Sequence, residues 1–124
     1  PHHVALVPLI ARTSKDRIQK IAAIAQGYVY VVSSLGVTGV RSNITTDIDG
    51  IVAEVRKATD IPVAVGFGIA VPEQAYKMAK ASDGAIVGSA IEKIVAQYGA
   101  NSPEHVYEYV KSMSEAVAQA AAEA

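Results

Sequence analysis

Four short apolar runs, each followed by a segment with helical periodicity, constrain the fold of this chain most strongly. The runs occupy residues 4–10, 28–32, 61–65 and 84–87. Because none of them alternates apolar with polar residues, each is typical of a parallel strand that is covered on both faces. Strands that alternate with helices form a parallel sheet with right-handed crossovers. The sequence therefore predicts an α/β fold with four parallel strand-helix units in a single domain, residues 1–124.

The first unit contains signals for its own boundaries. Pro8 removes one hydrogen-bond donor from the first run, so this strand is expected to lie at a sheet edge or to end early. Thr13 or Ser14 is expected to cap the following helix, with Asp16 in its first turn and Gly27 at its end. An apolar stripe identifies the face of this helix that enters the core. It consists of Ile18, Ile21, Ala22 and Ala25.

Three later segments also have helical patterns. One begins near Thr46, one begins at Pro72, and the last is expected to be capped at Ser102 and to run to the end of the chain. The first of these buries one apolar face, composed of Ile48, Ile51, Val52 and Val55. The last is expected to turn four residues inward, which are Val106, Val110, Met113 and Val117.

Glycines gather directly after the predicted strands, at the carboxyl edge where α/β folds bind ligands. They are Gly36, Gly39, Gly66, Gly68 and Gly88. The loop over residues 34–43 is too long for a bare connection, so we expect it to cover a site. At Gly88-Ser89 the last strand turns directly into a helix, which favours either a phosphate cradle made of backbone N–H groups or an ordinary helix start.

Composition argues against several classes of partner. The net charge is −1 and the basic residues are scattered, so we expect no nucleic-acid partner. No run approaches the roughly 18 apolar residues of a membrane span, and we expect no membrane partner. Cysteine is absent, which excludes thiolate metal sites and fits a cytoplasmic location. His2 and His3 are interpreted as a frayed terminus and not as metal ligands, and we expect neither a metal nor a cofactor.

Five segments, in this order and at these spacings, closely resemble the tryptophan synthase alpha subunit. They are Gly27-Tyr28-Val29-Tyr30, Gly36-Val37-Thr38-Gly39, Gly66-Phe67-Gly68-Ile69, Pro72-Glu73-Gln74 and Asp83-Gly84-Ala85-Ile86-Val87-Gly88-Ser89-Ala90-Ile91. The resemblance covers nearly the whole chain, but it corresponds only to the last four strand-helix units of that family's barrel. It therefore implies half of a TIM (β/α)8 barrel, four units plus a C-terminal helix.

The resemblance also implies an activity. The family is a lyase of tryptophan biosynthesis that cleaves indole-3-glycerol phosphate to indole and glyceraldehyde 3-phosphate, and it passes indole to a pyridoxal-phosphate beta subunit. By this resemblance the substrate phosphate is held by backbone N–H groups of four residues, namely Gly39, Gly68, Gly88 and Ser89. No Lys or Arg stands at those turns, which agrees with binding by amides and a helix dipole.

Three further residues acquire roles from the resemblance. Tyr30 and Phe67 are expected to line the indole pocket, because flat apolar rings suit an aromatic ligand. Thr38 is expected either to belong to a closing lid or to serve as an ordinary turn residue. The acid-base pair of the family, a glutamate and an aspartate, belongs to the first half of the barrel, and no matching motif occurs here. The chain alone is therefore expected to bind phosphate without turning over substrate.

A half-barrel leaves two unpaired strand edges and an apolar inner face, which favour association. The expected outcomes are a homodimer that closes a pseudo-barrel, which we favour, binding of the missing N-terminal half, or flattening of the sheet. Other phosphate-binding barrel enzymes, such as those of histidine synthesis, fit less well, since the Gly-Val-Thr-Gly and Gly-Phe-Gly segments argue against them. The alternative from another class is a non-catalytic, self-associating half-barrel fragment or scaffold.

Overall fold

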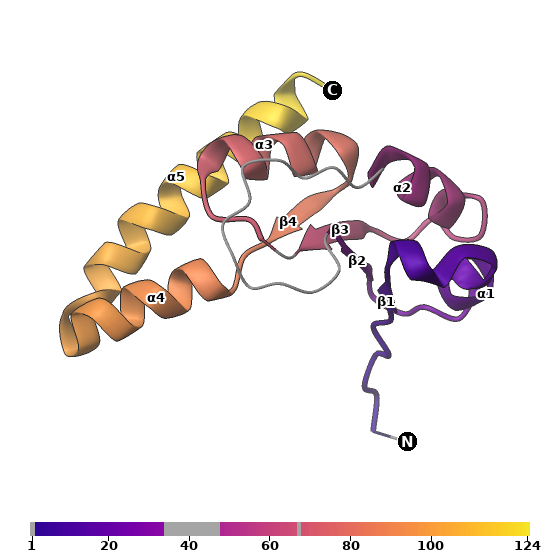
Figure 1. The fold of residues 1–124 in the computed structure, drawn as a ribbon, viewed down its shortest axis with the longest axis horizontal. Helices are drawn as coiled ribbons and strands as arrows, with labels where there is room; N and C mark the ends of the chain where they lie inside the picture. Colours follow the sequence, from indigo (N-terminus) through magenta and orange to yellow (C-terminus); the bar gives the residue numbers. More distant parts are fainter. Residues whose placement is uncertain (1, 34–47, 67) are drawn as a thin grey trace.

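The computed structural model describes residues 2–33, 48–66 and 68–124 of the chain. Several predictions concern residues outside these ranges: the long loop at residues 34–43 with Gly36, Thr38 and Gly39, the helix start near Thr46, and the role of Phe67. Four strands and their helices alternate along the chain, as expected for an α/β fold (Figure 1). Their order is β1 Leu9–Ile10, η1 Arg12–Arg17, α1 Ile18–Ala23, β2 Val29–Val32, α2 Ile48–Arg56, β3 Val63–Gly66, α3 Pro72–Ala81, β4 Gly84–Ile86, α4 Ser89–Tyr98, η2 Gly99–Asn101 and α5 Ser102–Ala122.

The four strands form one parallel sheet in the order β1-β2-β3-β4, which confirms the predicted topology. β1 and β4 are the edges of this sheet. The edge position of β1 agrees with Pro8, whose carbonyl still accepts a hydrogen bond from the N–H of Tyr30 at 3.0 Å.

The two faces of the sheet differ in burial. Because side chains alternate along each strand, the pairing register assigns every strand residue to one of two faces. On the first face five side chains are completely buried, namely Ile10, Val29, Val31, Val63 and Val65. On the second face Leu9 is 63% exposed, and Tyr30, Val32, Ala64 and Ile86 are half-buried. The expectation that each strand is covered on both faces is therefore wrong for the residues described.

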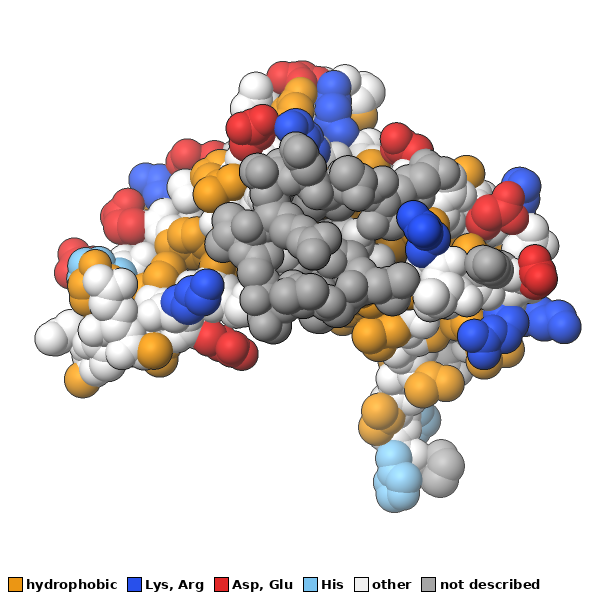
Figure 2. Space-filling model, viewed as in Figure 1, with side chains coloured by type: hydrophobic (Ala, Val, Ile, Leu, Met, Phe, Trp, Pro, Cys, Tyr) orange, Lys and Arg blue, Asp and Glu red, His pale blue; other side chains and the backbone are white. Residues whose placement is uncertain are grey.

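The first unit departs furthest from the prediction. The strand expected over residues 4–10 is reduced to β1, and Val4 and Leu6 are 80% and 61% exposed. The chain is apolar there, but it lies at an edge where pairing is available on one side only. Figure 2 shows hydrophobic side chains along the extension that leads to the N-terminus.

The predicted cap of the first helix is also wrong. Residues 12–17 form the 3-10 turn η1, and α1 begins only at Ile18 without a side-chain cap among the described residues. In the described part of the chain, Ser14 does not accept an N–H from the first turn of α1. Its hydroxyl accepts the N–H of Ala11, three residues earlier in the chain, at 3.2 Å. The predicted helix end at Gly27 is wrong as well, because α1 ends at Ala23 with Ile24 as its C-cap; Gly27 takes a left-handed φ of 78° in the connection to β2.

The apolar faces of α1, α2 and α3 form one core with the buried face of the sheet. The predicted face of α2 is confirmed, since Ile48, Ile51, Val52 and Val55 are all buried. The stripe of α1 is confirmed as well, with Ile18 and Ala22 buried and the other two members packed against the core. α3 begins at Pro72, as predicted, and buries Ala75 and Met78.

The last two helices, α4 and α5, pack against each other and extend beyond β4 (Figure 1). α5 also packs along α3, where Met113 is buried and Val106 and Val117 are half-buried. Val110 was expected to point inward, but it is 42% exposed, since the neighbouring Tyr109 takes the inward position at that turn. Ser102 does not cap α5; it is the first residue of the helix. None of the helices in the described ranges is long and apolar enough to cross a membrane.

Candidate functional site

The carboxyl ends of β2, β3 and β4 lie side by side. Val32, Gly66 and Ile86 are paired in one row across the three strands. The segments that follow them therefore start from a common edge, which is the edge where α/β folds bind ligands. This register brings together the turn after β3 and the beginning of α4, the two described places where backbone phosphate ligands were predicted.

Gly68 begins the turn after β3 in a conformation that favours glycine. Its φ is +77°, in the left-handed region, and it is exposed. No heavy atom of the described chain lies within 4 Å of the place where its Cβ would be. The backbone angle, and not crowding, is therefore the reason for glycine at this position.

Gly88 and Ser89 form the beginning of α4. Gly88 is the N-terminal cap residue, and its carbonyl accepts the N–H groups of Ile91 and Glu92 at 2.9 and 3.1 Å. Both Gly88 and Ser89 are exposed, and no described side chain caps this end of the helix. The first amides of a helix have no partner within the helix and lie at the positive end of its dipole. This arrangement suits an anion.

Tyr30 lies on the second face of the sheet, and its ring reaches across to β3. A Cβ added at Gly66 would overlap the Tyr30 hydroxyl and would lie 2.6 Å from its Cζ atom. Burial raises the pKa of Tyr30, and the nearby Tyr28 raises it further, so the hydroxyl is protonated at neutral pH. The glycine at position 66 thus provides the space for an aromatic ring at the carboxyl edge.

Ser33 holds the ends of β2 and β3 together at the same edge. It is completely buried, and both its backbone N–H and its hydroxyl donate to the carbonyl of Gly66, at 3.0 and 2.8 Å. Since these bonds fix the backbone at Gly66, the position of the following turn is fixed with it. No sequence motif marks Ser33 as a residue of the site.

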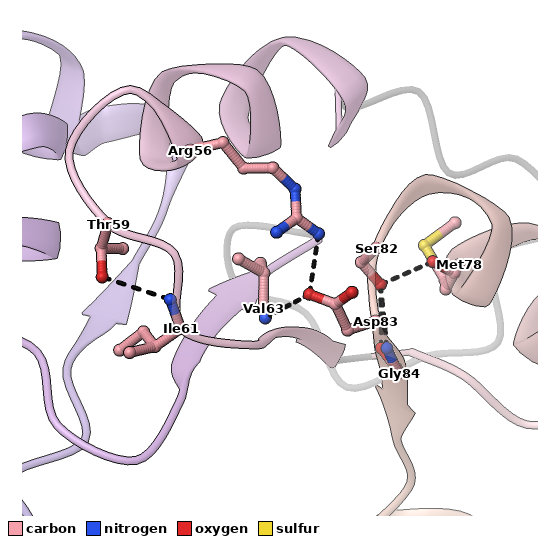
Figure 3. A network of polar contacts seen from close by, with 8 residues as sticks. All are labelled: Arg56, Thr59, Ile61, Val63, Met78, Ser82, Asp83 and Gly84. Carbon is pink, nitrogen blue, oxygen red and sulfur yellow. Dashed lines mark hydrogen bonds and ion pairs between the residues drawn. The ribbon is translucent and has the colours of Figure 1, made fainter.

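A polar network occupies the opposite edge, where β3 and β4 begin (Figure 3). The Asp83 carboxylate accepts the N–H of Val63 at 2.8 Å and pairs with the Arg56 guanidinium at 2.7 Å. The Ser82 hydroxyl lies within hydrogen-bond distance of the carbonyls of Met78 and Gly84, at 2.7 and 3.0 Å, and so links the end of α3 to the start of β4. Because the network lies at the amino ends of the strands, we assign it to stability and not to ligand binding.

The charge of Asp83 is stabilised within this network. Partial burial opposes ionisation of the carboxyl, but the hydrogen bond from Val63 and the charge and hydrogen bond of Arg56 outweigh it. The pKa of Asp83 is therefore lowered from its ordinary value. Both side chains of the ion pair are more than 40% exposed, so solvent weakens the attraction.

Comparison with known proteins identifies the family of this chain. The family model of the tryptophan synthase alpha chain matches residues 1–122. The chain belongs to the tryptophan synthase alpha chain family. The tryptophan synthase alpha chain of Lactiplantibacillus plantarum is 57% identical over 96 residues, which cover 77% of this chain and 36% of that relative.

Solved structures support the same family. Mycobacterium tuberculosis tryptophan synthase matches with a TM-score of 0.76 and 30% identity, covering 94% of this chain and 43% of that one. The tryptophan synthase α2β2 complex from the hyperthermophile Pyrococcus furiosus matches with a TM-score of 0.74 and 29% identity, covering 90% and 46%. The chain thus spans less than half the length of each of these three proteins. The four-stranded sheet fits half of a TIM barrel.

The structure brings together three of the described residues predicted for the site, since Gly68, Gly88 and Ser89 all follow strands of one paired row. Tyr30 lies on the half-exposed face of the same sheet. Sequence reasoning missed the residues that support these positions, among them Ser33 and Tyr109. Their contacts join segments that are 33 and 39 residues apart, and no local pattern marks such pairs.

Proposed function

We propose that this chain carries the phosphate- and indole-binding half of the lyase that cleaves indole-3-glycerol phosphate to indole and glyceraldehyde 3-phosphate. The observation that carries the proposal is the paired row Val32, Gly66 and Ile86. This row sets the left-handed Gly68 turn beside the start of α4, which no described side chain caps. Both places present backbone N–H groups, and no Lys or Arg stands at either turn in the sequence.

Residues outside the described part complete this proposal. Gly39 supplies a further phosphate-binding amide, Phe67 forms the indole pocket with Tyr30, and Thr38 belongs to the lid over the bound ligand. The half-buried ring of Tyr30 supports the pocket, because it offers an apolar surface at the carboxyl edge.

A charge placed at the start of α4 tests the phosphate site. Ser89→Asp puts a carboxylate where the helix dipole favours it, so the fold should be as stable as before or slightly more so. The same carboxylate repels phosphate by about 1–4 kcal/mol at 4 Å, and phosphate affinity should fall about fivefold or more. The matched control is Ser114→Asp, an exposed position on α5.

Amide chemical shifts of the ¹⁵N-labelled chain, titrated with inorganic phosphate at constant ionic strength, measure the effect. The proposal expects saturable shifts at Gly68, Gly88 and Ser89 in the parent chain and in Ser114→Asp, and weak ones in Ser89→Asp. Equal affinity in the two aspartate variants would contradict it. Absence of any saturable shift in the parent chain would remove the phosphate site altogether.

We propose further that a polypeptide of these 124 residues does not release indole from indole-3-glycerol phosphate. Proton transfer to the indole ring and from the glycerol hydroxyl needs positioned carboxylates, each worth roughly 10²–10⁴ in rate. The family's acid-base pair has no counterpart motif in this sequence. An assay of indole release by the purified polypeptide tests this directly, and release above that of a blank preparation would contradict it.

The unpaired edges of the sheet and its exposed apolar surface support association with another chain. β1 and β4 are unpaired edges in the sheet as described, and Leu9 is 63% exposed on the second face. We propose a homodimer that pairs these edges, with the N-terminal half of the barrel and a tryptophan synthase beta subunit as further partners; the α2β2 complex of the Pyrococcus furiosus protein supports the last of these. Sedimentation equilibrium giving about twice 12.9 kDa supports the homodimer, and a monomer contradicts it.

The second candidate function is a non-catalytic scaffold that self-associates through the same surface. The exposed Leu9 and the unpaired edges favour it equally. Adding a polypeptide of the N-terminal half separates the two candidates. Recovery of indole formation supports the split lyase, whereas a formed but inactive complex supports the scaffold.

A further inference from the structure

The turn that carries Gly68 is fixed by groups on three sides. Ile69 is only 3% exposed and anchors the turn in the core. The side-chain carbonyl of Gln74 accepts the N–H groups of Ala70 and Val71, at 2.8 and 3.2 Å. The hydroxyl of Tyr109 donates to the carbonyl of Ala70 at 2.7 Å.

The contact of Tyr109 differs from the other two in its origin. Ile69 and Gln74 belong to the turn and to the first turn of α3, whereas Tyr109 comes from the middle of α5, 39 residues away from Ala70. Tyr109 is half-buried and packs against the core, so its ring is held in place. Burial raises the pKa of Tyr109, which keeps the hydroxyl protonated and able to donate.

We propose that Tyr109 is a positioning residue, whose hydrogen bond to the Ala70 carbonyl holds the Gly68 turn in the conformation that binds phosphate. This inference rests on the proposed phosphate site. The bond fixes the orientation of the peptide group that follows Ala70, two residues beyond the left-handed Gly68. A turn that is already in its binding conformation does not have to be ordered by the ligand, and its affinity is higher for that reason.

The expected size of the effect follows from the hydrogen bond that is lost. Tyr109→Phe keeps the ring in the core and removes only the donor to the half-buried carbonyl. If the stabilisation of the turn falls by the value of one neutral hydrogen bond, phosphate affinity falls about fivefold.

Tyr76→Phe is the matched control. The Tyr76 hydroxyl of α3 donates to Glu123, the residue that follows α5, and this contact involves no residue of the turn. Each variant therefore loses one tyrosine hydroxyl hydrogen bond, but only the bond of Tyr109 reaches the Gly68 turn. If the two hydroxyls contribute only to general stability, both variants unfold more easily and bind phosphate equally well. If Tyr109 positions the turn, Tyr109→Phe alone binds phosphate more weakly.

The experiment measures three quantities on the parent chain, Tyr109→Phe and Tyr76→Phe. These are the dissociation constant for inorganic phosphate, the amide shifts of Gly68 and Val71 without phosphate, and the unfolding midpoint in urea. We expect Tyr109→Phe to bind phosphate about fivefold more weakly and to shift both amides, while Tyr76→Phe matches the parent in both.

Two failures are distinguishable. If the parent chain binds phosphate and Tyr109→Phe binds it equally well, the positioning role is wrong and the proposed site remains. If the parent chain does not bind phosphate, the proposed site is wrong and the inference falls with it. In that second case the amide shifts still report whether Tyr109 orders the turn as a structural contact.

Discussion

Addition of a single methyl group at Gly66 should destabilise the fold through its contact with Tyr30. A Cβ at this position would lie 2.6 Å from Cζ and 2.9 Å from Cε1 of the Tyr30 ring, closer than real Cβ atoms approach other heavy atoms. The backbone at Gly66 cannot move away easily, because its carbonyl accepts two hydrogen bonds from the buried Ser33. The ring of Tyr30 must therefore move instead.

The cost of Gly66→Ala is expected to be about 1–3 kcal/mol, the usual range for an extra group in a packed site. Tyr30 is half-buried and not a fully buried core residue, which favours the lower part of that range. Urea unfolding followed by far-UV circular dichroism measures the free energy of unfolding. Gly84→Ala is the matched control, because no described atom lies within 4 Å of a Cβ at that strand position.

A double-mutant cycle identifies the cause. In a Tyr30→Ala background the overlap is absent, so Gly66→Ala should cost almost nothing and the coupling energy should be about 1–3 kcal/mol. Tyr30→Phe should rescue only in part, since Cζ and Cε1 of the ring remain. The reasoning is refuted if Gly66→Ala is equally costly with and without the Tyr30 ring.

Two further predictions concern the opposite edge and the Gly68 turn. Asp83→Ala removes the acceptor of the Val63 N–H and should cost about 1–2 kcal/mol at pH 7, while Asp83→Asn keeps an acceptor oxygen and should cost less. Because the folded pKa of Asp83 is lowered, its stabilisation is present above the unfolded pKa of about 3.9 and is lost as the pH falls through the folded value. Urea unfolding at pH 7 and pH 3 checks this. If the difference in free energy of unfolding between the parent chain and Asp83→Asn does not shrink at pH 3, the prediction is contradicted. Gly68→Ala should cost about 1–2 kcal/mol from its φ of +77° alone, against little or no loss for Gly84→Ala, and equal losses in thermal unfolding would exclude backbone strain as the cause.

The sequence predicted the parts of the fold that depend on local pattern. The face of α2 was read correctly from its spacing, and Pro72 marked the start of α3. The same method failed at Val110, which is exposed. The face of α5 that packs against the core includes the neighbouring Tyr109 instead. A helical period alone does not decide between adjacent residues of comparable apolar surface.

The first unit shows a second reason for failure. An apolar run predicts burial, but the run over residues 4–10 lies at an edge of the sheet, and most of it is exposed. Thr13 or Ser14 was expected to cap the first helix, but the Ser14 hydroxyl accepts the N–H of Ala11, which precedes it in the chain. Both errors arise because edge position and cap direction depend on the surrounding elements, which a single segment does not specify.

The sequence by itself determined the alternation of strands and helices, the parallel sheet and the glycines after its strands, since periodicity and backbone freedom are properties of short segments. Only the tertiary structure decided which face of the sheet is buried, which glycine accommodates the Tyr30 ring, and which side chains hold the Gly68 turn. These features depend on contacts between residues that are 33 to 39 positions apart, such as Ser33 with Gly66 and Ala70 with Tyr109. Contacts of this kind form only when the chain has folded, because their free energy arises from packing between elements and not from the preference of either residue alone.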